Sequence, residues 1–158
     1  MPLNRVALTA LALSLCACQS VAVSPSEPRQ SALSVTADDL PETSGLAASH
    51  RKPGFFWAVN DSGNSAVIHL LDGELQPRGA VPVTPKNRDW EDLASYQRDG
   101  QSWIIIAETG DNLRQYPTYF LYVFSEDTLL DGIGGEPVSP DHTVEFTYED
   151  GAQNCEAI

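Results

Sequence analysis

The sequence is poor in cysteine, methionine and basic residues. Its 158 residues include only 3 cysteines, 1 methionine and 9 basic residues, against 22 acidic ones. Two of the cysteines, Cys16 and Cys18, lie near the N-terminus, so Cys155 alone remains for the rest of the chain. A single cysteine cannot form an intramolecular disulfide, which excludes a disulfide framework for this part. We interpret Cys155 as a small buried residue and not as a nucleophile, because no basic residue precedes it closely.

Positive charge is also scarce, and the net charge is −13 at pH 7. This charge argues against nucleic acid as a partner and against an electrostatic hold on anionic lipid. It suits a periplasmic or extracellular domain, or a domain that binds cations. The apolar and aromatic runs are dense enough to build a core, so the composition does not indicate disorder.

Recognisable catalytic machinery is missing as well. There is no Gly-x-Ser-x-Gly motif, and neither Ser44 nor Ser62 has a histidine placed by sequence to activate it. His50, His69 and His142 are scattered without the spacing of a zinc site, and no stretch matches an EF-hand loop. We therefore assign no catalytic residues from the sequence, and we do not expect a zinc site.

The N-terminus has the features of a targeting segment. Arg5 is followed by an apolar run at residues 6–15, which is too short to cross a bilayer as a helix. The run ends in Leu-Cys-Ala-Cys, which resembles the lipobox of bacterial lipoproteins. The resemblance implies that residues 1–17 are a signal peptide, that Cys18 is lipidated, and that Gln19 directs the protein to the outer membrane. A plain secretory signal with incidental cysteines is the alternative. Cleavage would remove one of the nine basic residues and change the net charge from −13 to −14.

Beyond a flexible tether at residues 18–33, the chain is predicted to be all-β. Short apolar runs alternate with turn residues such as Asp99-Gly100, and no window shows a helical apolar stripe of useful length. We predict that the tryptophans pack in the core and that residues 125–142 form an insertion. The expected strands lie at residues 45–49, 55–59, 67–71, 80–83, 93–96, 103–107, 119–124 and 144–148.

Two stretches of the chain, about fifty residues apart, are similar. In each, an acidic segment (ETSGLA at 42–47, EDLA at 91–94) precedes an apolar run and then a polar one (NDSGN at 60–64, ETGDN at 108–112). A third copy begins with NCEAI at 154–158. Repeats of this length built from short strands are typical of propeller blades. We therefore predict a partial β-propeller at residues 34–158, with about two and a half four-stranded blades of a six-bladed ring, and we expect a longer gene product.

The repeated acidic residues are the candidate site. Inner strands of a propeller line its central channel, so acidic residues that precede them would converge there and repel one another unless a cation neutralises them. A hard cation such as Ca²⁺ prefers oxygen ligands. We predict Ca²⁺ as a cofactor, with the metal ligands Glu42, Glu91, Glu156, Asn60, Asp61, Asp111 and Asn112.

A plainer interpretation of these residues stays open. Asn, Asp, Ser and Gly in clusters are turn residues first, because they tolerate positive φ and bond their own backbone. A glutamate that caps the backbone amides of a neighbouring blade would also recur with every repeat.

The motifs together resemble a set of bacterial secreted and lipoprotein propellers, similar to NHL-like, gluconolactonase-like and phytase-like propellers. The resemblance covers about residues 38–158 and rests on the segments named above, with WAVNDSGN at 57–64, DWEDLA at 89–94 and DG at 150–151. It implies a divalent metal in the channel, with Glu42 as the first-blade ligand and Glu91 and Glu156 as its equivalents.

These observations lead to two main functional hypotheses. The first is a binding or scaffold module of the cell envelope, anchored through Cys18 and facing the periplasm or the exterior. The alternative is a Ca²⁺-dependent hydrolase, a lactonase or a phosphoesterase, in which the metal activates water. A structural domain in a larger envelope assembly is a third hypothesis. The sequence does not identify a substrate or ligand.

Overall fold

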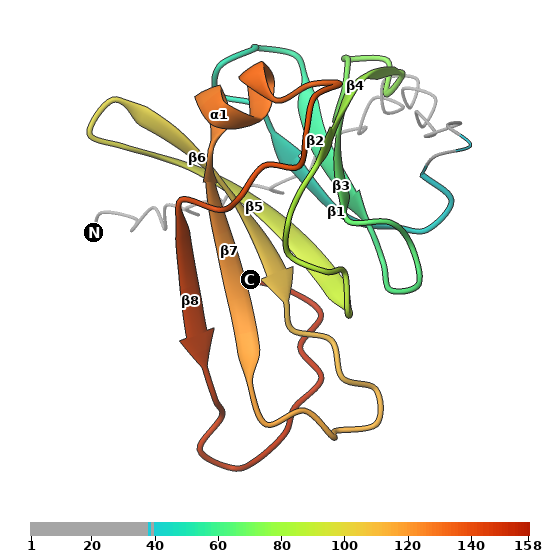
Figure 1. Ribbon diagram of the computed structural model, residues 1–158, viewed down its shortest axis with the longest axis vertical. Helices are drawn as coiled ribbons and strands as arrows, with labels where there is room; N and C mark the ends of the chain where they lie inside the picture. Colours follow the sequence, from blue (N-terminus) through green and yellow to red (C-terminus); the bar gives the residue numbers. More distant parts are fainter. Residues whose placement is uncertain (1–37, 39) are drawn as a thin grey trace, which may run out of the picture. The chain divides into compact units, whose positions relative to one another are not determined.

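The computed structural model describes residue 38 and residues 40–158, which belong to one compact unit, Leu33–Ile158. The predicted signal peptide, the lipidation site at Cys18 and the tether at 18–33 lie outside the described residues. The regular structure of the described part is two four-stranded antiparallel sheets and one short helix, so the prediction of an all-β protein is confirmed (Figure 1).

In each sheet, neighbours in the sequence are also neighbours in space. The first sheet has the order β1 (Thr43–Ala48), β2 (Phe56–Asn60), β3 (Val67–Leu71) and β4 (Pro77–Pro82). The second has the order β5 (Trp90–Arg98), β6 (Gln101–Glu108), β7 (Tyr119–Ser125) and β8 (His142–Phe146). All eight predicted strands are present, seven of them with shifted ends. In the turn between β5 and β6, Asp99 and Gly100 have φ of 51° and 78°, as the predicted Asp-Gly hairpin requires.

The main core lies between the two sheets. Successive side chains of a strand point to opposite faces of its sheet. On one face of the first sheet, Trp57 and Ile68 pack in the same core as Ile104 and Phe124 of the second sheet. Trp57 and Trp90 are fully buried, as predicted. Trp103 is half-buried instead and stacks between Tyr96 and His142, with ring centroids 6.4 and 5.7 Å away.

The first strands of the two sheets, β1 and β5, approach each other closely at Gly45. A Cβ on this glycine would lie 2.5 Å from the backbone nitrogen of Leu93, inside any normal contact distance. Glycine is therefore required here for the packing of β1 against β5, although its φ is not positive. This contact brings the segments before both strands to the same end of the inter-sheet interface.

The segment predicted as an insertion contains the single helix of the described residues, α1 (Glu126–Asp131), and packs on the first sheet. Two acidic residues in its first turn, Glu126 and Asp127, suit the positive end of the helix dipole. The carboxylate of Glu126 is fully buried and accepts hydrogen bonds from the loop between β1 and β2 and from β2 itself. Its donors are the Ser49 hydroxyl, the His50 and Arg51 amides at 3.1 and 3.2 Å, and Trp57 Nε1 at 3.0 Å. The segment thus joins the two sheets.

The strand registers define which residues of the two sheets are equivalent. Both first strands have an irregularity at the same place, between Thr43 and Gly45 in β1 and between Trp90 and Asp92 in β5. Aligning the two irregularities matches residue 44 with Glu91 and residue 42 with Asp89. The equivalence expected from sequence, Glu42 with Glu91, is therefore shifted by two residues.

Candidate metal centre

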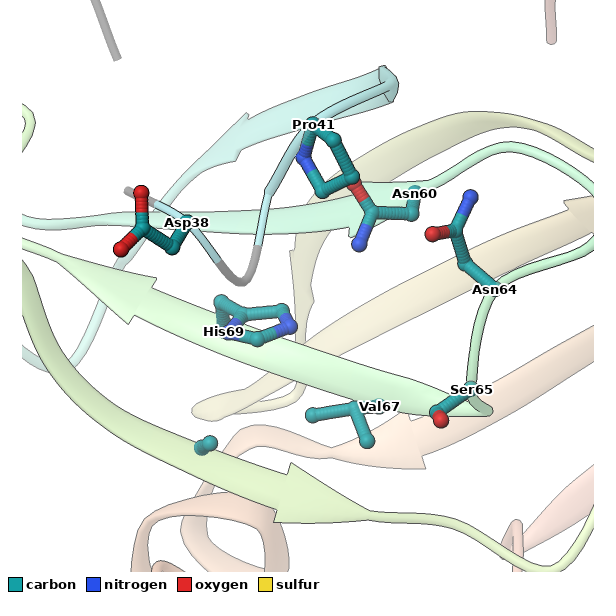
Figure 2. A pocket seen from close by; sticks show the side chains of 8 residues that line it. Asp38, Pro41, Asn60, Asn64, Ser65, Val67 and His69 are labelled. Atoms are coloured by element: carbon teal, nitrogen blue, oxygen red, sulfur yellow. The ribbon is translucent and has the colours of Figure 1, made fainter. Parts of the chain in front are cut away.

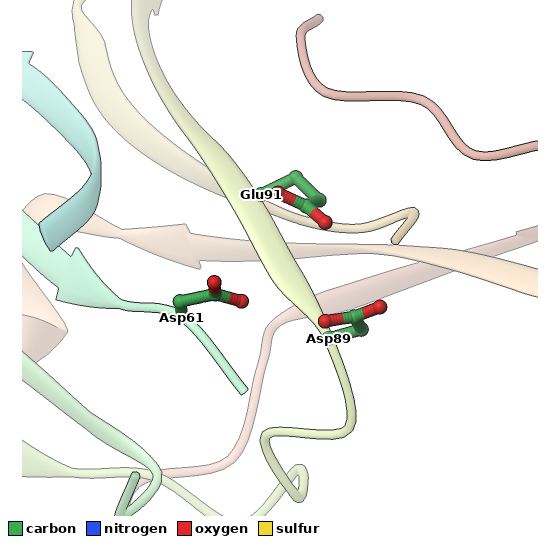
Figure 3. Close-up of side chains that lie close together, drawn as sticks. All are labelled: Asp61, Asp89 and Glu91. Atoms are coloured by element: carbon green, nitrogen blue, oxygen red, sulfur yellow. The ribbon is translucent and has the colours of Figure 1, made fainter. Parts of the chain in front are cut away.

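Three carboxylates meet at the end of the interface between β1 and β5. Asp61 directly follows β2, Asp89 precedes β5, and Glu91 is the second residue of β5. One carboxylate oxygen of each can be chosen so that all three lie within 4.8 Å of one another. Asp61 is half-buried, whereas Asp89 and Glu91 are each only 8% exposed. Figure 3 shows Asp61 coming from the first sheet and the other two from the start of β5.

Backbone hydrogen bonds fix the segments that carry these side chains. The Asp61 amide donates to the carbonyl oxygen of Glu42 at 2.8 Å, which ties the end of β2 to the residue before β1. In the second sheet, the Gly110 amide donates to the carbonyl oxygen of Asp89 at 3.1 Å. Residues 42 and 89 are equivalent in the two sheets. The two bonds therefore lie at the same place in each sheet, at the open end of the β1–β2 hairpin and of the β5–β6 hairpin.

Asn87 connects the two halves of the cluster. Its side-chain Nδ2 donates to the carbonyl oxygens of Asn60 and Asp61 at 2.9 and 2.8 Å. Its Oδ1 accepts a hydrogen bond of 3.2 Å from the Trp90 amide. One amide side chain therefore holds the segment with Asp61 against the turn that leads into β5.

A further carboxylate, that of Glu108, holds the backbone of Asp89 in place. It is 1% exposed and accepts hydrogen bonds from the Asp89 amide at 2.7 Å and the Arg88 amide at 3.1 Å. Burial raises the pKa of Glu108, while these two amides and the Arg88 charge oppose the rise. Since its oxygens are engaged with backbone donors, Glu108 positions Asp89 and is not a free ligand.

Gly110 provides the space that the carboxylates occupy. A Cβ at this position would overlap Oε1 of Glu91 and the carboxylate of Asp89. Any residue other than glycine would displace the two buried carboxylates of the cluster. This glycine therefore serves the site itself and not a turn, because its φ is not positive.

The cluster is strongly acidic. Burial, followed by the neighbouring Glu156, Asp89 and Asp61, raises the pKa of Glu91 to about 8. Burial also raises the pKa of Asp89, opposed by a hydrogen bond from the Ser62 hydroxyl and reinforced by Asp61. Within the described part of the chain, none of the ion pairs involves Asp61, Asp89 or Glu91. Near neutral pH this site needs either a shared proton or a cation.

Four of the residues predicted as ligands lie at or beside the cluster. Asp61 and Glu91 belong to it, and the carboxyl group of Glu156 lies within hydrogen-bonding reach of Glu91. Asn60 is 4% exposed, and its Oδ1 accepts a hydrogen bond of 3.3 Å from the Glu42 amide.

The other three predicted ligands are occupied elsewhere or exposed. The carboxylate of Glu42 is exposed and accepts a hydrogen bond from Asn64 Nδ2 at 3.0 Å. Asn112 is exposed, and Asn154 Nδ2 lies 3.3 Å from its Oδ1. Asp111 is 1% exposed and organises its own loop, since it accepts hydrogen bonds from the Gln115 and Tyr116 amides and the Tyr119 hydroxyl at 2.8 to 3.0 Å. Burial works to raise the pKa of Asp111, but these bonds outweigh it and lower the pKa.

Sequence reasoning did not select Asp89, Asn87 or Gly110. Asp89 lies in the acidic DWED segment, which indicated the region, but the irregularity in β5 hid its equivalence with residue 42. Asn87 and Gly110 carry no charge, and both read as ordinary turn residues in the sequence.

Two of the pockets in the described part of the chain are lined by members of the cluster or by their sequence neighbours. The larger, of about 410 Å³, is on the face of the first sheet that points away from the second sheet, with His69 of β3 and Asn60 of β2 among its lining residues (Figure 2). The smaller, of about 190 Å³, opens beside Asp89 and is lined also by Ser62, Arg88 and Tyr116. Only the smaller pocket shares a residue with the three-carboxylate cluster.

Comparison with protein-family models, with curated proteins and with solved structures found no match to this chain. Among the described residues, no helix has the length and apolar character needed to cross a membrane.

The donor set suits a hard divalent cation. Carboxylate oxygens are the ligands that Ca²⁺ and Mg²⁺ prefer, and Ca²⁺ binds them at about 2.3–2.6 Å. Oxygens on opposite sides of one Ca²⁺ are thus about 5 Å apart, so three oxygens within 4.8 Å of one another are close enough to contact one ion. Asp61, Asp89 and Glu91 would hold the ion, and Ca²⁺ would supply positive charge that the site otherwise lacks.

Proposed function

We propose that this protein binds a divalent cation, Ca²⁺ in the first place, through Asp61, Asp89 and Glu91. The observation that carries the proposal is the environment of Glu91. Glu91 is only 8% exposed and lies with Asp61 and Asp89 in one group of carboxylates, and burial together with neighbouring carboxylates raises its pKa to about 8. Burying a carboxylate in this way is costly unless it is protonated or meets a cation.

A cation at this position would link the two sheets. Asp61 belongs to the end of the first sheet, whereas Asp89 and Glu91 belong to the start of the second. Without the ion, ionised carboxylates repel one another across the interface. With the ion bound, each carboxylate is attracted to the same cation. The bound cation therefore acts as a clamp between consecutive sheets as well as a functional group.

We also propose that the two sheets are successive blades of a β-propeller. Three features support this: each sheet is a four-stranded meander, the two first strands pack side by side at Gly45, and both have the same irregularity. Placing first strands side by side is how propeller blades surround a central channel. The carboxylates at the start of β5 then face that channel.

The most economical role for such a protein is a binding or scaffold module of the cell envelope. The lipobox-like sequence before Cys18 supports a lipid anchor at the outer membrane, and the net charge of −13 disfavours nucleic acid as a partner. The cation site would stabilise the surface on which a ligand or protein partner binds.

A cation-dependent shift in thermal stability tests the site. A ligand that binds only the folded state stabilises it by about 2.7 kcal/mol at a hundred times its dissociation constant. We expect CaCl₂ to raise the melting temperature of the wild-type protein by several degrees and EDTA to reverse the rise. Glu91→Gln should abolish the shift, while Glu74→Gln, which alters an exposed carboxylate in a turn, should keep it. An equal shift in both variants would refute the site.

Hydrolysis remains the second candidate because of the pocket of about 190 Å³ beside Asp89. A cation next to such a pocket could polarise a substrate oxygen and lower the pKa of a bound water. Lactone and phosphoester substrates assayed with CaCl₂ and with EDTA would test it. Activity that disappears both in EDTA and in Asp89→Asn would support hydrolysis, and the absence of turnover on either class would leave the binding role.

A further inference from the structure

The strand registers also define which faces of the two sheets are equivalent. In the first sheet, the face that packs against the second sheet carries seven buried apolar residues: Ala47, Trp57, Val59, Ile68, Leu70, Val81 and Val83. Aligning Gly45 with Asp92 and following the paired residues across both sheets gives seven counterparts in the second sheet. We call these counterparts the outer face of the second sheet: Ala94, Ile105, Ala107, Leu121, Val123, Val144 and Phe146. All seven are apolar, so the second sheet repeats the apolar face of the first.

The outer face is more open than its counterpart, which the second sheet covers. Val144 is 48% exposed, whereas its counterpart Val81 is fully buried. Four further residues are half-buried although their counterparts are at most 6% exposed: Ala94, Ile105, Leu121 and Phe146. Only Ala107 and Val123 are as buried as the residues they match. An exposed apolar patch of neighbouring residues is typical of an interaction surface.

The outer face also carries little charge. Because side chains alternate along a strand, the strand residues on this side are every second residue of 92–98, 101–107, 119–125 and 142–146. Asp92 is the only acidic residue among these strand positions, although the chain has 22 acidic residues. Its two carboxylate oxygens already accept hydrogen bonds from the Leu93 and Ile158 amides at 2.8 and 2.9 Å. Such a face suits an apolar partner better than a charged one.

Residues 154–158 indicate how that partner is placed. In the first sheet, Gly45 lies directly against the backbone of Asp92 and Leu93, at the start of the next sheet. In the second sheet, the counterpart of Gly45 is Asp92, and the Ile158 amide donates to its Oδ2. Ile158 therefore takes the place beside the second sheet that Leu93 takes beside the first. Like Leu93 it is apolar, but it is 49% exposed instead of 3%.

The segments after β2 and β6 make matching contacts. Asp61 follows β2, and its carbonyl oxygen accepts a hydrogen bond from Asn87, just before the next sheet begins. Its counterpart Thr109 follows β6, and its carbonyl oxygen accepts a hydrogen bond of 3.1 Å from the Cys155 amide. The Thr109 hydroxyl donates in turn to the Cys155 carbonyl at 2.7 Å. Residues 154–158 thus lie where the first strand of a following sheet would begin.

We propose that a third four-stranded sheet of the same repeat packs on the outer face, with residues 154–158 as the start of its first strand. The proposal rests on the blade arrangement proposed above and adds the partner of the second sheet. Repeats of this kind bury their apolar faces by stacking on their neighbours. The second sheet presents Leu93, Ile104, Ile106 and Phe124 to the first, so the third sheet carries large apolar residues at the same places.

A chain extended by its own second sheet tests this inference. Because Ile158 matches Leu93, residues 94–158 can be appended directly after Ile158, which supplies a third sheet with its own Ile104, Ile106 and Phe124. We expect the extended chain to unfold in urea in a single transition, at a higher midpoint than the original chain. An appended sheet that unfolds separately from the first two, at a lower urea concentration, would overturn the proposal.

Val144→Glu, made only in the original second sheet, reports whether the outer face is covered. In the original chain this residue is already 48% exposed, so the urea midpoint should change little. In the extended chain the new charge would be buried, and the midpoint should fall clearly. Thr143→Glu is the matched control, because Thr143 is exposed and points to the opposite face of the same strand. Equal effects of Val144→Glu in the two chains would contradict a covered face.

Light scattering of the original chain tests a second copy as the other occupant. We expect a monomer. A dimer that Val144→Glu dissociates would show that a second copy covers the outer face, and it would overturn the third sheet. Calorimetry with CaCl₂ on the original chain keeps the cation site separate. Ca²⁺ binding without docking of the appended sheet would refute this inference alone, and docking without Ca²⁺ binding would refute the cation site alone.

Discussion

Gly110, in the backbone after β6, lies so close to Glu91 that a Cβ at this position would overlap Oε1 of Glu91 and require the end of that side chain to move. The same Cβ would overlap the carboxylate of Asp89, so both buried carboxylates of the cluster depend on a glycine here. The acidic cluster is thus shaped by a residue without a side chain.

Gly110→Ala should weaken cation binding and stability together. The added methyl group would push Glu91 and Asp89 apart, and inserting a methylene into a packed site typically costs about 1–3 kcal/mol. Urea unfolding and a Ca²⁺ titration measure the two effects. Gly135→Ala is the matched control, because its Cβ would meet only ordinary contacts from 3.4 Å outward. Wild-type affinity in Gly110→Ala would contradict the geometry described here.

Glu126→Gln should destabilise the protein without changing cation affinity. The buried carboxylate accepts hydrogen bonds from four groups in residues 49–57, and hydrogen bonds to a charged group contribute about 1.5–3 kcal/mol each. The glutamine NH₂ cannot accept, so donors such as Trp57 Nε1 would lose a partner. Asp127→Asn changes an exposed neighbour and serves as the control. Equal urea midpoints for the two variants would show that Glu126 does not join the sheets.

Asn87→Ala should reduce Ca²⁺ affinity even though Asn87 is not a ligand. The substitution removes the bonds from Nδ2 to the Asn60 and Asp61 carbonyls and frees Asp61 from the turn that leads into β5. Leaving buried carbonyls without donors costs about 1–3 kcal/mol. Calorimetry should show weaker binding, while Gln101→Ala, at an exposed strand end, should bind like the wild type. Asn87→Asp, which keeps the size but lacks the donor, should not restore affinity.

The metal-free protein should lose stability as the pH rises. Burial and the surrounding carboxylates raise the pKa of Glu91 from its ordinary 4.5 to about 8. Between these values the folded state holds a proton that the unfolded chain has released, so the free energy of unfolding falls with increasing pH and levels off above about 8. The raised pKa values of Asp89 and Glu108 act in the same direction.

Urea unfolding in EDTA at about pH 5, 7 and 9 checks this slope. Glu91→Gln should flatten it. Saturating CaCl₂ should reverse it, because the cation binds deprotonated carboxylates and binding therefore strengthens with pH. A wild-type profile in EDTA that rises from pH 5 to 9 would mean that Glu91 is ionised throughout and already paired.

Local patterns predicted much of the fold. Asp99-Gly100 between two apolar runs predicted the hairpin of β5 and β6, and its two positive φ values confirm that turn. Repetition of the ETSGLA and EDLA segments predicted two similar units, and the structure has two four-stranded sheets. These features depend on neighbours in the sequence, which is why the sequence alone revealed them.

Features that depend on distant residues were not predictable in the same way. The irregularities in β1 and β5 make Glu42 equivalent to Asp89 and not to Glu91. Neither irregularity can be recognised from the amino-acid types in the sequence. Glu126 looked like one of several acidic residues in an insertion, yet its partners lie 69 to 77 positions away in the sequence. Convergence of Asp61 with Asp89 required the inter-sheet contact at Gly45, whose tightness only the three-dimensional packing shows.

Calorimetric titration of the purified protein with CaCl₂, after treatment with EDTA, tests the central claim most directly. The account predicts one Ca²⁺ bound per chain in the wild type and in Glu74→Gln, and loss of this binding in both Asp89→Asn and Glu91→Gln. Absence of binding in the wild type, or unchanged binding in these last two variants, would contradict a cation site at Asp61, Asp89 and Glu91.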